Sequence, residues 1–190
     1  GPTEEQQKII DAAGNIVVIA RPGSGKTYTI VKKIDKILEK SYEYQGIIAI
    51  SYTKKASREL EQRCKMTGIS MKSSFFGTID NFYISEIIMP FVKYFFNKRI
   101  ELQVEAELEK YPQYTILRNI KNGINSQIEI ALINALAEGH IFLEISGETA
   151  LFVLSQIPEA REYIQAKYTH IFIDEYQDCG NIQHEIFMKM

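Results

Sequence analysis

The sequence predicts an α/β fold, in which helices flank a parallel sheet and a mostly helical insertion separates two of its strands. The stretches 16–20, 47–50 and 171–173 are wholly apolar, which is typical of strands buried on both faces of a sheet. Helical periodicity follows the first two stretches, and this alternation favours parallel strands joined by right-handed crossovers. From about 97 to 167 the pattern is mostly helical and contains no strong strand.

The expected elements follow from apolar periodicity and from helix start and stop signals. After the first strand, the apolar residues Ile30, Ile34, Ile37 and Leu38 share one helical face. The predicted elements of the first half are a helix at Thr3–Ala13, a strand at Asn15–Ala20, a helix at Gly25–Lys40, a strand at Gly46–Ser51, a helix at Lys54–Met66, a strand at Phe75–Gly77 and a helix at Thr78–Phe96.

The insertion carries its own helix signals. Ser126 and Glu129 have the spacing of a capping box, and Gly139 is expected to end the helix that begins there. Pro158 suits the first turn of another helix, and a strand at His170–Glu175 then returns the chain to the sheet. We predict an α/β domain made of residues 3–96 and 168–190, with a helical insertion subdomain at 97–167.

Composition limits the function classes. The 190 residues are 45% hydrophobic and 24% charged, with a formal net charge of −2, so a nucleic acid would have to bind through a local basic patch. The cysteines, Cys64 and Cys179, lack a metal-binding spacing and suit reduced thiols in a cytoplasmic protein. No leader or membrane span is expected. The apolar run that reaches Met190 has no helix stop signal, so we expect a fragment of a longer protein.

The most informative motif lies between the first strand and the following helix. "GSGKT", residues 23–27, has the context of a phosphate-binding P-loop, although Ala20 replaces the first glycine of the pattern. Gly23, Ser24 and Gly25 would turn their N–H groups toward phosphate oxygens. Lys26 would reach the β- and γ-phosphates, and Thr27 would bind Mg²⁺. The alternative is a plain strand-to-helix turn with a surface lysine.

A pair of carboxylates ends the last strand. Asp174 would hold Mg²⁺ through its coordinated water, and Glu175 would orient and deprotonate the attacking water. The alternative is a pair of solvated acids at the end of a strand. Together with the P-loop, this pair indicates a P-loop NTPase that hydrolyses a nucleoside triphosphate.

Further motifs carry a resemblance. "ARPGSGKT", "ISYTKKASREL", "FGTIDNF" and "IDEYQD" are similar, in this order, to the first helicase motifs of the UvrD/Rep group of superfamily 1, and "TEEQQ" is similar to the adenine-reading motif of that group. The resemblance implies the N-terminal RecA-like domain of an ATP-dependent, 3′ to 5′ DNA helicase. By position, Gln6 would read adenine, or cap the first helix. Gln177 would sense the γ-phosphate or the water, and Asp178 would brace the motif or cap the next helix.

The same resemblance places single-stranded DNA at the ends of the next two strands. Tyr52 would stack on a base, while Thr53, Lys55 and Thr78 would contact the DNA. Asp80 stands where the family often has His and would bond a base edge or cap its helix. Phe82 and Tyr83 are expected to belong to the core. For Arg58, Arg63 and Lys65 we favour a solvated helix face.

Two longer stretches resemble a narrower group. "FFGTIDNFYISEIIMPFVKYFF" and "AREYIQAKYTHIFIDEYQD" are similar to the UvrD-like helicase subunit of Gabija anti-phage systems. This resemblance implies a partner nuclease and a role in defence against phage. The motif residues themselves do not separate defence from repair.

Other functions stay open at the level of sequence. The chain could be a P-loop ATPase used as a nucleotide- or DNA-end-sensing switch, or its insertion could bind a partner. The later motifs of the family, including the arginines that stabilise the transferred phosphoryl group, lie beyond Met190. We therefore expect the 190 residues alone to bind nucleotide weakly, to hydrolyse it poorly and not to unwind DNA.

Overall fold

The chain divides into two compact units, which are described separately. The computed structural model describes residues 16–20 and 26–174, with side chains for 28–173. The sheet unit contains the described residues up to Phe82 and from Arg161 onward, and the helical unit contains Tyr83–Ala160. The predicted domain boundaries at 96/97 and 167/168 stay a prediction.

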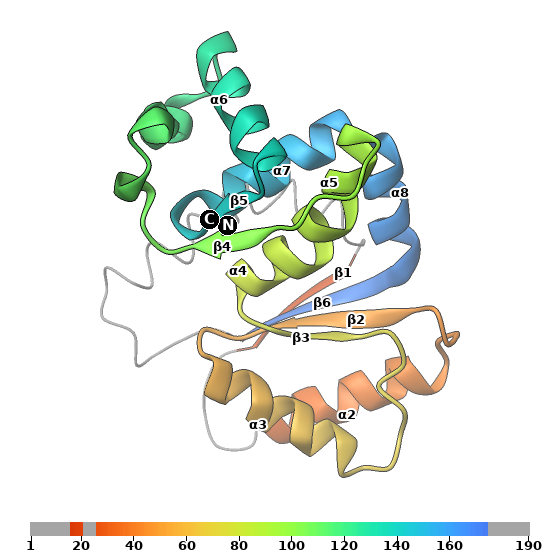
Figure 1. Ribbon diagram of the computed structural model, residues 1–190. Coiled ribbons are helices and arrows are strands. Elements are labelled where there is room, and N and C mark those ends of the chain that lie inside the picture. Colours follow the sequence, from red (N-terminus) through yellow and green to blue (C-terminus); the bar gives the residue numbers. More distant parts are fainter. Residues whose placement is uncertain (1–15, 21–25, 175–190) are drawn as a thin grey trace. The chain divides into compact units, whose positions relative to one another are not determined.

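The sheet unit is built on four parallel strands in the order β1-β6-β2-β3 (Figure 1). These strands are β1 (Ile16–Ala20), β2 (Gly46–Ile50), β3 (Phe75–Gly77) and β6 (Tyr168–Asp174). The last described strand, β6, therefore lies inside the sheet, paired with β1 on one side and with β2 on the other. This arrangement confirms the predicted parallel α/β fold.

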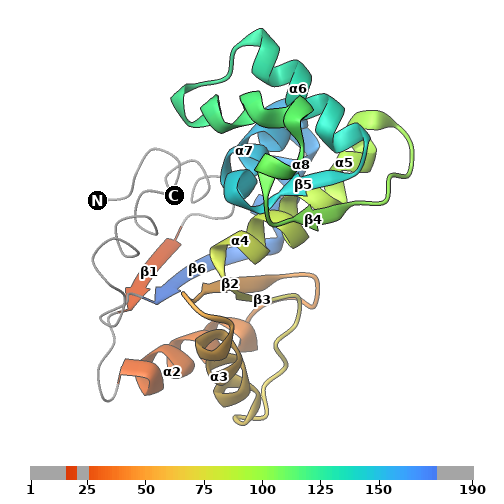
Figure 2. The same ribbon diagram turned by 60° about the vertical axis from the view of Figure 1, so that its left-hand side comes forward.

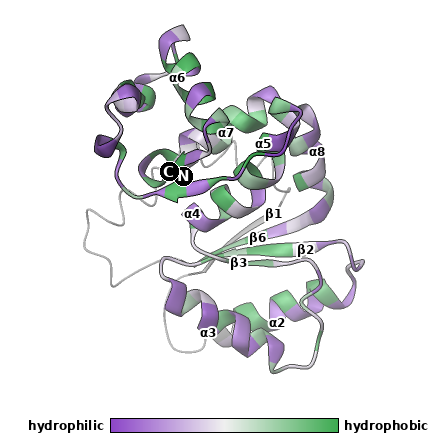
Figure 3. Ribbon diagram, viewed as in Figure 1, coloured by the Kyte–Doolittle hydropathy of each residue, from purple (hydrophilic) through white to green (hydrophobic). Residues whose placement is uncertain are grey.

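Two helices cover one face of this sheet, namely α2 (Lys26–Glu39) and α3 (Lys54–Lys65) (Figure 2). Every residue of β2 is buried, as a strand covered on both faces requires. Figure 3 shows hydrophobic residues along β2 and mixed polarity along the two helices. The core on this face contains Ile30, Val31, Ile34 and Leu38 of α2, Leu60 and Cys64 of α3, and Ile47, Ala49 and Phe172 of the strands.

The predicted helix at Thr78–Phe96 is one helical run with a change of winding inside it. It consists of α4 (Ile79–Phe82), a π-helical segment at Tyr83–Ile88 and α5 (Met89–Phe96). Pro90 lies at the start of α5 and has no N–H to donate to the carbonyl of Glu86. Because proline breaks the ordinary ladder of helical hydrogen bonds, a wider π turn precedes it.

The helical unit adds to one expectation and corrects another. The insertion was expected to be mostly helical with no strong strand, and it contains two short strands, β4 (Gln103–Glu105) and β5 (His140–Phe142), which form a two-stranded parallel sheet. Three-residue strands are too short to give a periodic pattern in the sequence. The helix α6 (Ser126–Ala137) is capped by Asn125 and not by Ser126, because the Asn125 side chain accepts a hydrogen bond from the N–H of Ile128 at 2.8 Å.

The other predicted helix signals of this segment are confirmed. Gly139 follows α6 with φ +94°, and Pro158 is the first residue of α8 (Pro158–Lys167). The remaining helical segments are 3₁₀ turns at Leu108–Lys110, Pro112–Asn122 and Leu143–Ile145, and the helix α7 (Ser146–Gln156). Among the described helices, none is both long and apolar enough to cross a membrane.

Candidate active site

The strand ends that adjoin the predicted site segments lie at one edge of the sheet. Parallel strands present their carboxyl ends at the same edge, and in open α/β sheets ligands bind outside these ends. Ala20 ends β1, Asp174 ends β6, Ile50 ends β2 and Gly77 ends β3. The register pairs Ala20 with Asp174, and Ile50 with both Ile173 and Gly77. The segments predicted to bind nucleotide and DNA therefore all leave the sheet at this edge.

The phosphate-binding side begins where α2 starts. Lys26 is the first residue of this helix, and its first turn contains no acidic residue. The partial positive charge of the helix N-terminus is therefore not offset locally, which suits an anion. For Lys26 and Thr27 the structure describes the backbone alone, and Gly23, Ser24 and Gly25 lie outside the described residues.

The acidic side of the site begins at the end of β6. Asp174 is the last residue of that strand and pairs in register with the last residue of β1. A carboxylate at this position suits a hard cation such as Mg²⁺, which favours oxygen ligands and is commonly shared with substrate phosphates. The group implied by the motifs thus fits the backbone arrangement. Glu175, Gln177 and Gln6 lie outside the described residues.

Sequence reasoning missed Ser51, the residue that follows β2. Its side chain is only 1% exposed. Its N–H donates to the carbonyl of Gly77 at 2.9 Å, whereas its hydroxyl has no hydrogen-bond partner in the described part of the chain. A polar atom buried in this way costs free energy of folding unless a ligand or another residue pairs with it. The only signal in the sequence is a hydroxyl residue at the junction of a buried strand and the "YTKKA" segment.

The next three residues form the start of α3. Tyr52 is half-buried, and Thr53 is exposed. Thr53 is the N-cap, because its Oγ1 accepts a hydrogen bond from the N–H of Ala56 at 3.0 Å. Its hydroxyl hydrogen is not consumed by this bond and can still be donated to a phosphate. The first turn of α3 lacks acidic residues, and Lys54 and Lys55 are exposed, so this helix end also favours an anion.

Thr78 begins the helix that follows β3. Its Oγ1 lies 3.4 Å from the N–H of Asn81, and its carbonyl accepts from the N–H of Phe82 at 3.0 Å. Thr78 therefore occupies the capping position that was one of two roles considered for Asp80. Phe82 and Tyr83 are each 1% exposed, which confirms that they belong to the core.

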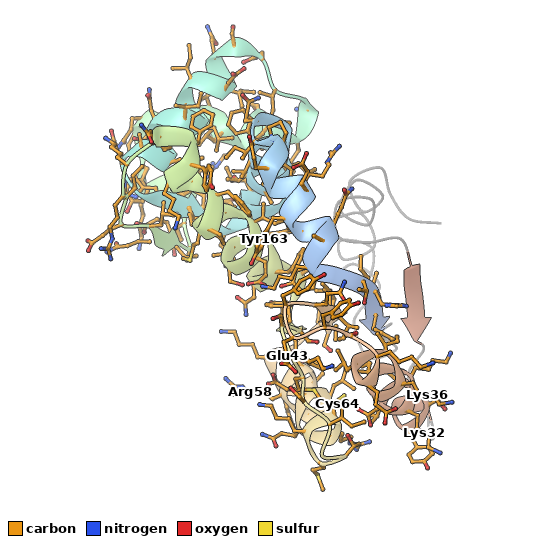
Figure 4. The ribbon with its side chains drawn as sticks, turned by 90° about the vertical axis from the view of Figure 1, so that its right-hand side faces the viewer. Lys32, Lys36, Glu43, Arg58, Cys64 and Tyr163 are labelled. Carbon is orange, nitrogen blue, oxygen red and sulfur yellow. The ribbon has the colours of Figure 1, made fainter. Side chains whose placement is uncertain are left out.

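The basic residues farther along α3 face solvent. Arg58, Arg63 and Lys65 are exposed, and Lys65 lies 3.9 Å from the Glu61 carboxylate. Figure 4 shows Arg58 on the outer side of this helix. A solvated helix face was expected for these three residues and is confirmed.

Cys64 lies on the opposite side of α3, between this helix and α2 (Figure 4). Burial, together with the nearby carboxylates of Asp35 and Glu61, raises the pKa of its thiol to about 12. Since the thiolate is the nucleophile and the metal ligand, this cysteine is a core residue and takes no part in the chemistry of the site.

Comparison with known proteins adds the family. A family model described as "UvrD/REP helicase N-terminal domain" matches residues 2–146 and 127–190. Gabija protein GajB of Bacillus cereus (strain VD045) is 34% identical over 193 residues, which cover 97% of this chain and 36% of that protein. The ATP-dependent DNA helicase PcrA of Staphylococcus aureus (strain Mu50 / ATCC 700699) is 22% identical over 222 residues, covering 97% of this chain and 30% of PcrA. PcrA of Bacillus subtilis (strain 168) is 20% identical over 224 residues, covering 98% and 30%. The chain spans about a third of the length of these relatives.

Proposed function

Because the chain belongs to the UvrD/REP helicase N-terminal domain family, we propose that it is the ATP-binding part of a DNA helicase or translocase that couples ATP hydrolysis to 3′ to 5′ movement on single-stranded DNA. One observation carries the proposal. The segments with phosphate-binding, acidic and aromatic-basic character all leave the same edge of the parallel sheet. A motor needs this proximity, because the state of the bound nucleotide has to change the affinity for DNA.

We propose the following roles at the nucleotide. Lys26 neutralises charge on the β- and γ-phosphates, and the backbone of Gly23–Gly25 surrounds them. Thr27 and Asp174 hold Mg²⁺, which stabilises the charge of the leaving phosphate when it is bound. Glu175 orients the attacking water and accepts its proton, and Gln177 senses the γ-phosphate. Gln6 reads the adenine edge.

The DNA track is proposed along the segments that follow β2 and β3. Tyr52 stacks on a base. The hydroxyl groups of Thr53 and Thr78 and the ammonium group of Lys55 bind the sugar-phosphate backbone of the DNA. The support from the structure is the exposed, acid-free first turn of α3 beside a half-buried tyrosine. Stacking and phosphate contact do not depend on base identity, as a translocating protein requires.

The similarity to GajB supports a narrower proposal. We propose that the protein acts in the cytoplasm in defence against phage and works together with a nuclease subunit. This assignment would be tested by co-purification with a nuclease encoded beside it. Loss of phage resistance in a Lys26→Ala variant that still binds the nuclease would separate the motor from the assembly.

The first experiment measures ATP hydrolysis by the complete protein with and without single-stranded DNA. Glu175→Gln serves as the blank. Tyr52→Ala is expected to weaken DNA binding by about 1–3 kcal/mol, while Tyr52→Phe keeps the stacking ring and stays near wild type. Tyr42→Ala is the matched control, because Tyr42 is 67% exposed and precedes the amino end of β2, whereas Tyr52 follows its carboxyl end. An equal rate of ATP hydrolysis with and without single-stranded DNA would contradict the motor function and favour a nucleotide-driven switch.

A further inference from the structure

The starting point is the unpaired hydroxyl of Ser51. Ser51 and Asp35 are the two residues in the described part of the chain that have a buried side-chain polar atom without a hydrogen-bond partner. Asp35 lies in the middle of α2, beside Cys64. Ser51 lies at the edge that carries the nucleotide and DNA segments, and it is the more deeply buried of the two.

The register of the sheet places Ser51 next to Asp174. β2 and β6 are adjacent parallel strands, and their last paired residues are Ile50 and Ile173. The following residues, Ser51 and Asp174, therefore occupy neighbouring positions on strands about 4.8 Å apart. On its other side, Ser51 is fixed by the hydrogen bond from its N–H to the carbonyl of Gly77.

The face of the sheet is also defined. Ile47 and Ala49 precede Ser51 by four and two residues and belong to the core shared with α2 and α3. Since alternate residues of a strand lie on the same face, Ser51 continues this row. It thus occupies the sheet face covered by α2, the helix that starts at the phosphate-binding segment.

We propose that Ser51 is a positioning residue for the hydrolytic site, whose hydroxyl donates a hydrogen bond to the carboxylate of Asp174 and holds it in its metal-binding orientation. This inference rests on the proposed function. A hydroxyl donor is suited to the task because a hydrogen bond to a carboxylate is charge-assisted and stronger than one between neutral groups. It also fixes one oxygen while it leaves the other free for the metal and its water.

The position of Ser51 in the chain gives this bond a second effect. Tyr52 and Thr53 follow it directly, and Thr53 caps α3. A shift of the β2–α3 connection on the DNA track would therefore move the hydroxyl that holds Asp174. The binding of DNA and the orientation of the metal-binding carboxylate therefore depend on the same β2–α3 connection.

The test uses the complete protein with Ser51→Ala, Ser51→Thr and a matched control, Ser57→Ala. Ser57 is also buried, at 5% exposure, but lies within α3. The first measurement is the Mg²⁺ concentration at half-maximal binding of a fluorescent ATP analogue. The second is the thermal unfolding midpoint without nucleotide.

We expect Ser51→Ala to raise the half-maximal Mg²⁺ concentration about tenfold, the loss that corresponds to one charge-assisted hydrogen bond. Ser51→Thr should bring it back to within about twofold of wild type, because the hydroxyl is kept. The unfolding midpoint of Ser51→Ala should fall by at most a few degrees, the cost of about one hydrogen bond. Ser57→Ala should leave the Mg²⁺ dependence unchanged.

Two results would overturn the inference while the proposed function stands. One is an unchanged Mg²⁺ dependence in Ser51→Ala when wild type binds the analogue and a Lys26→Ala blank does not. The other is a lower unfolding midpoint with unchanged Mg²⁺ dependence, which would make Ser51 a structural residue. If wild type itself shows no Mg²⁺-dependent binding of the analogue, the proposed function fails and this inference fails with it.

Discussion

The imidazole Nδ1 of His140 lies 3.2 Å from the carboxylate Oε1 of Glu105, and this contact joins the two short strands of the helical unit. Both side chains are about one-fifth exposed. On its other side, His140 Nε2 lies 3.9 Å from the Glu138 carboxylate. Rings of Tyr111 and Tyr114 flank the imidazole, with centroids at 4.7 and 5.9 Å. β4 and β5 pair over only three residues each, so side-chain contacts carry much of their stability.

Replacing Glu105 with Gln is expected to lower the free energy of unfolding by about 1 kcal/mol, because the carboxylate that accepts the hydrogen bond becomes a neutral amide. Urea unfolding of Glu105→Gln, His140→Gln and the double variant measures this coupling. Glu109→Gln is the matched control. Glu109 is 68% exposed and lies 3.5 Å from Arg118, so its loss should cost less than about 0.5 kcal/mol. Equal effects at both positions would contradict the structural role of the His140–Glu105 contact.

The pH dependence of stability should contain a contribution from His170. Burial lowers the pKa of this imidazole, which lies in β6 with Nδ1 2.8 Å from the Thr169 hydroxyl. Above about pH 6.5 both the native and the unfolded state are neutral at this position. Below it, the unfolded chain binds a proton that the native state resists, so stability falls as the pH decreases toward the native pKa.

His170→Gln should therefore flatten the fall in the free energy of unfolding between about pH 7 and pH 5. Urea denaturation at several pH values measures the slope. His140→Gln serves as the control for replacing a histidine elsewhere in the chain. A slope that is the same in wild type and His170→Gln would contradict the prediction.

Cys64 should be unreactive in the folded protein. With a pKa of about 12, only roughly one thiol in ten thousand is ionised at pH 8, and the thiolate is the reactive form. In a Cys179→Ser background, a thiol reagent should label Cys64 only after denaturation. Asp35→Asn removes one of the charges that raise the pKa and should speed labelling modestly. Rapid labelling of the native parent would show that the core between α2 and α3 opens.

Gly46→Ala should destabilise the sheet unit strongly. A Cβ at Gly46 would overlap backbone atoms of Ser73 and Ser74, which cannot move aside as a flexible side chain can. The Ser74 hydroxyl also accepts a hydrogen bond from the N–H of Ile47 at 2.9 Å, so the two segments are fixed to each other. The expected loss is roughly 2 kcal/mol or more in the free energy of unfolding.

Gly68→Ala is the control for this substitution. Gly68 has φ +84° and nothing near its missing Cβ, so alanine there should cost only about 1 kcal/mol of backbone strain. Thermal or urea unfolding compares the two variants. Similar losses would mean that close packing at Gly46 is not the cause.

The parts of the fold that sequence reasoning could predict are those with strong local signals. The wholly apolar runs 16–20 and 47–50 gave strands at the right places, and Gly139 and Pro158 marked helix ends correctly. The short strands β4 and β5 carry no such signal, because their pairing depends on contacts between residues far apart in the sequence. The N-cap of α6 lies one residue before the predicted one, because Asn125 and Ser126 are both good capping residues.

The candidate site shows the same limit. Motif spacing locates Lys26, Asp174 and Tyr52, since it reflects the order of strand, loop and helix. It does not indicate that the Ser51 hydroxyl is buried without a hydrogen-bond partner among the described residues, because that depends on which strand lies beside β2. Only the pairing of β2 with β6 brings Ser51 next to an acidic residue.

The pairing of β2 with β6 also determines when the sheet can be completed during synthesis of the chain. Thr169 and Gly46, which are 123 positions apart, lie beside each other at the start of β6 and β2. At about 5–20 residues per second, a ribosome needs roughly 6–25 s to make the chain between them. During that time β2 has an open edge on the side that β6 will occupy, whereas residues 83–160 form a compact unit that is complete before β6 is made. The nascent chain is thus most exposed to mispairing before β6 emerges, and binding of a chaperone to the early strands would protect it in this interval.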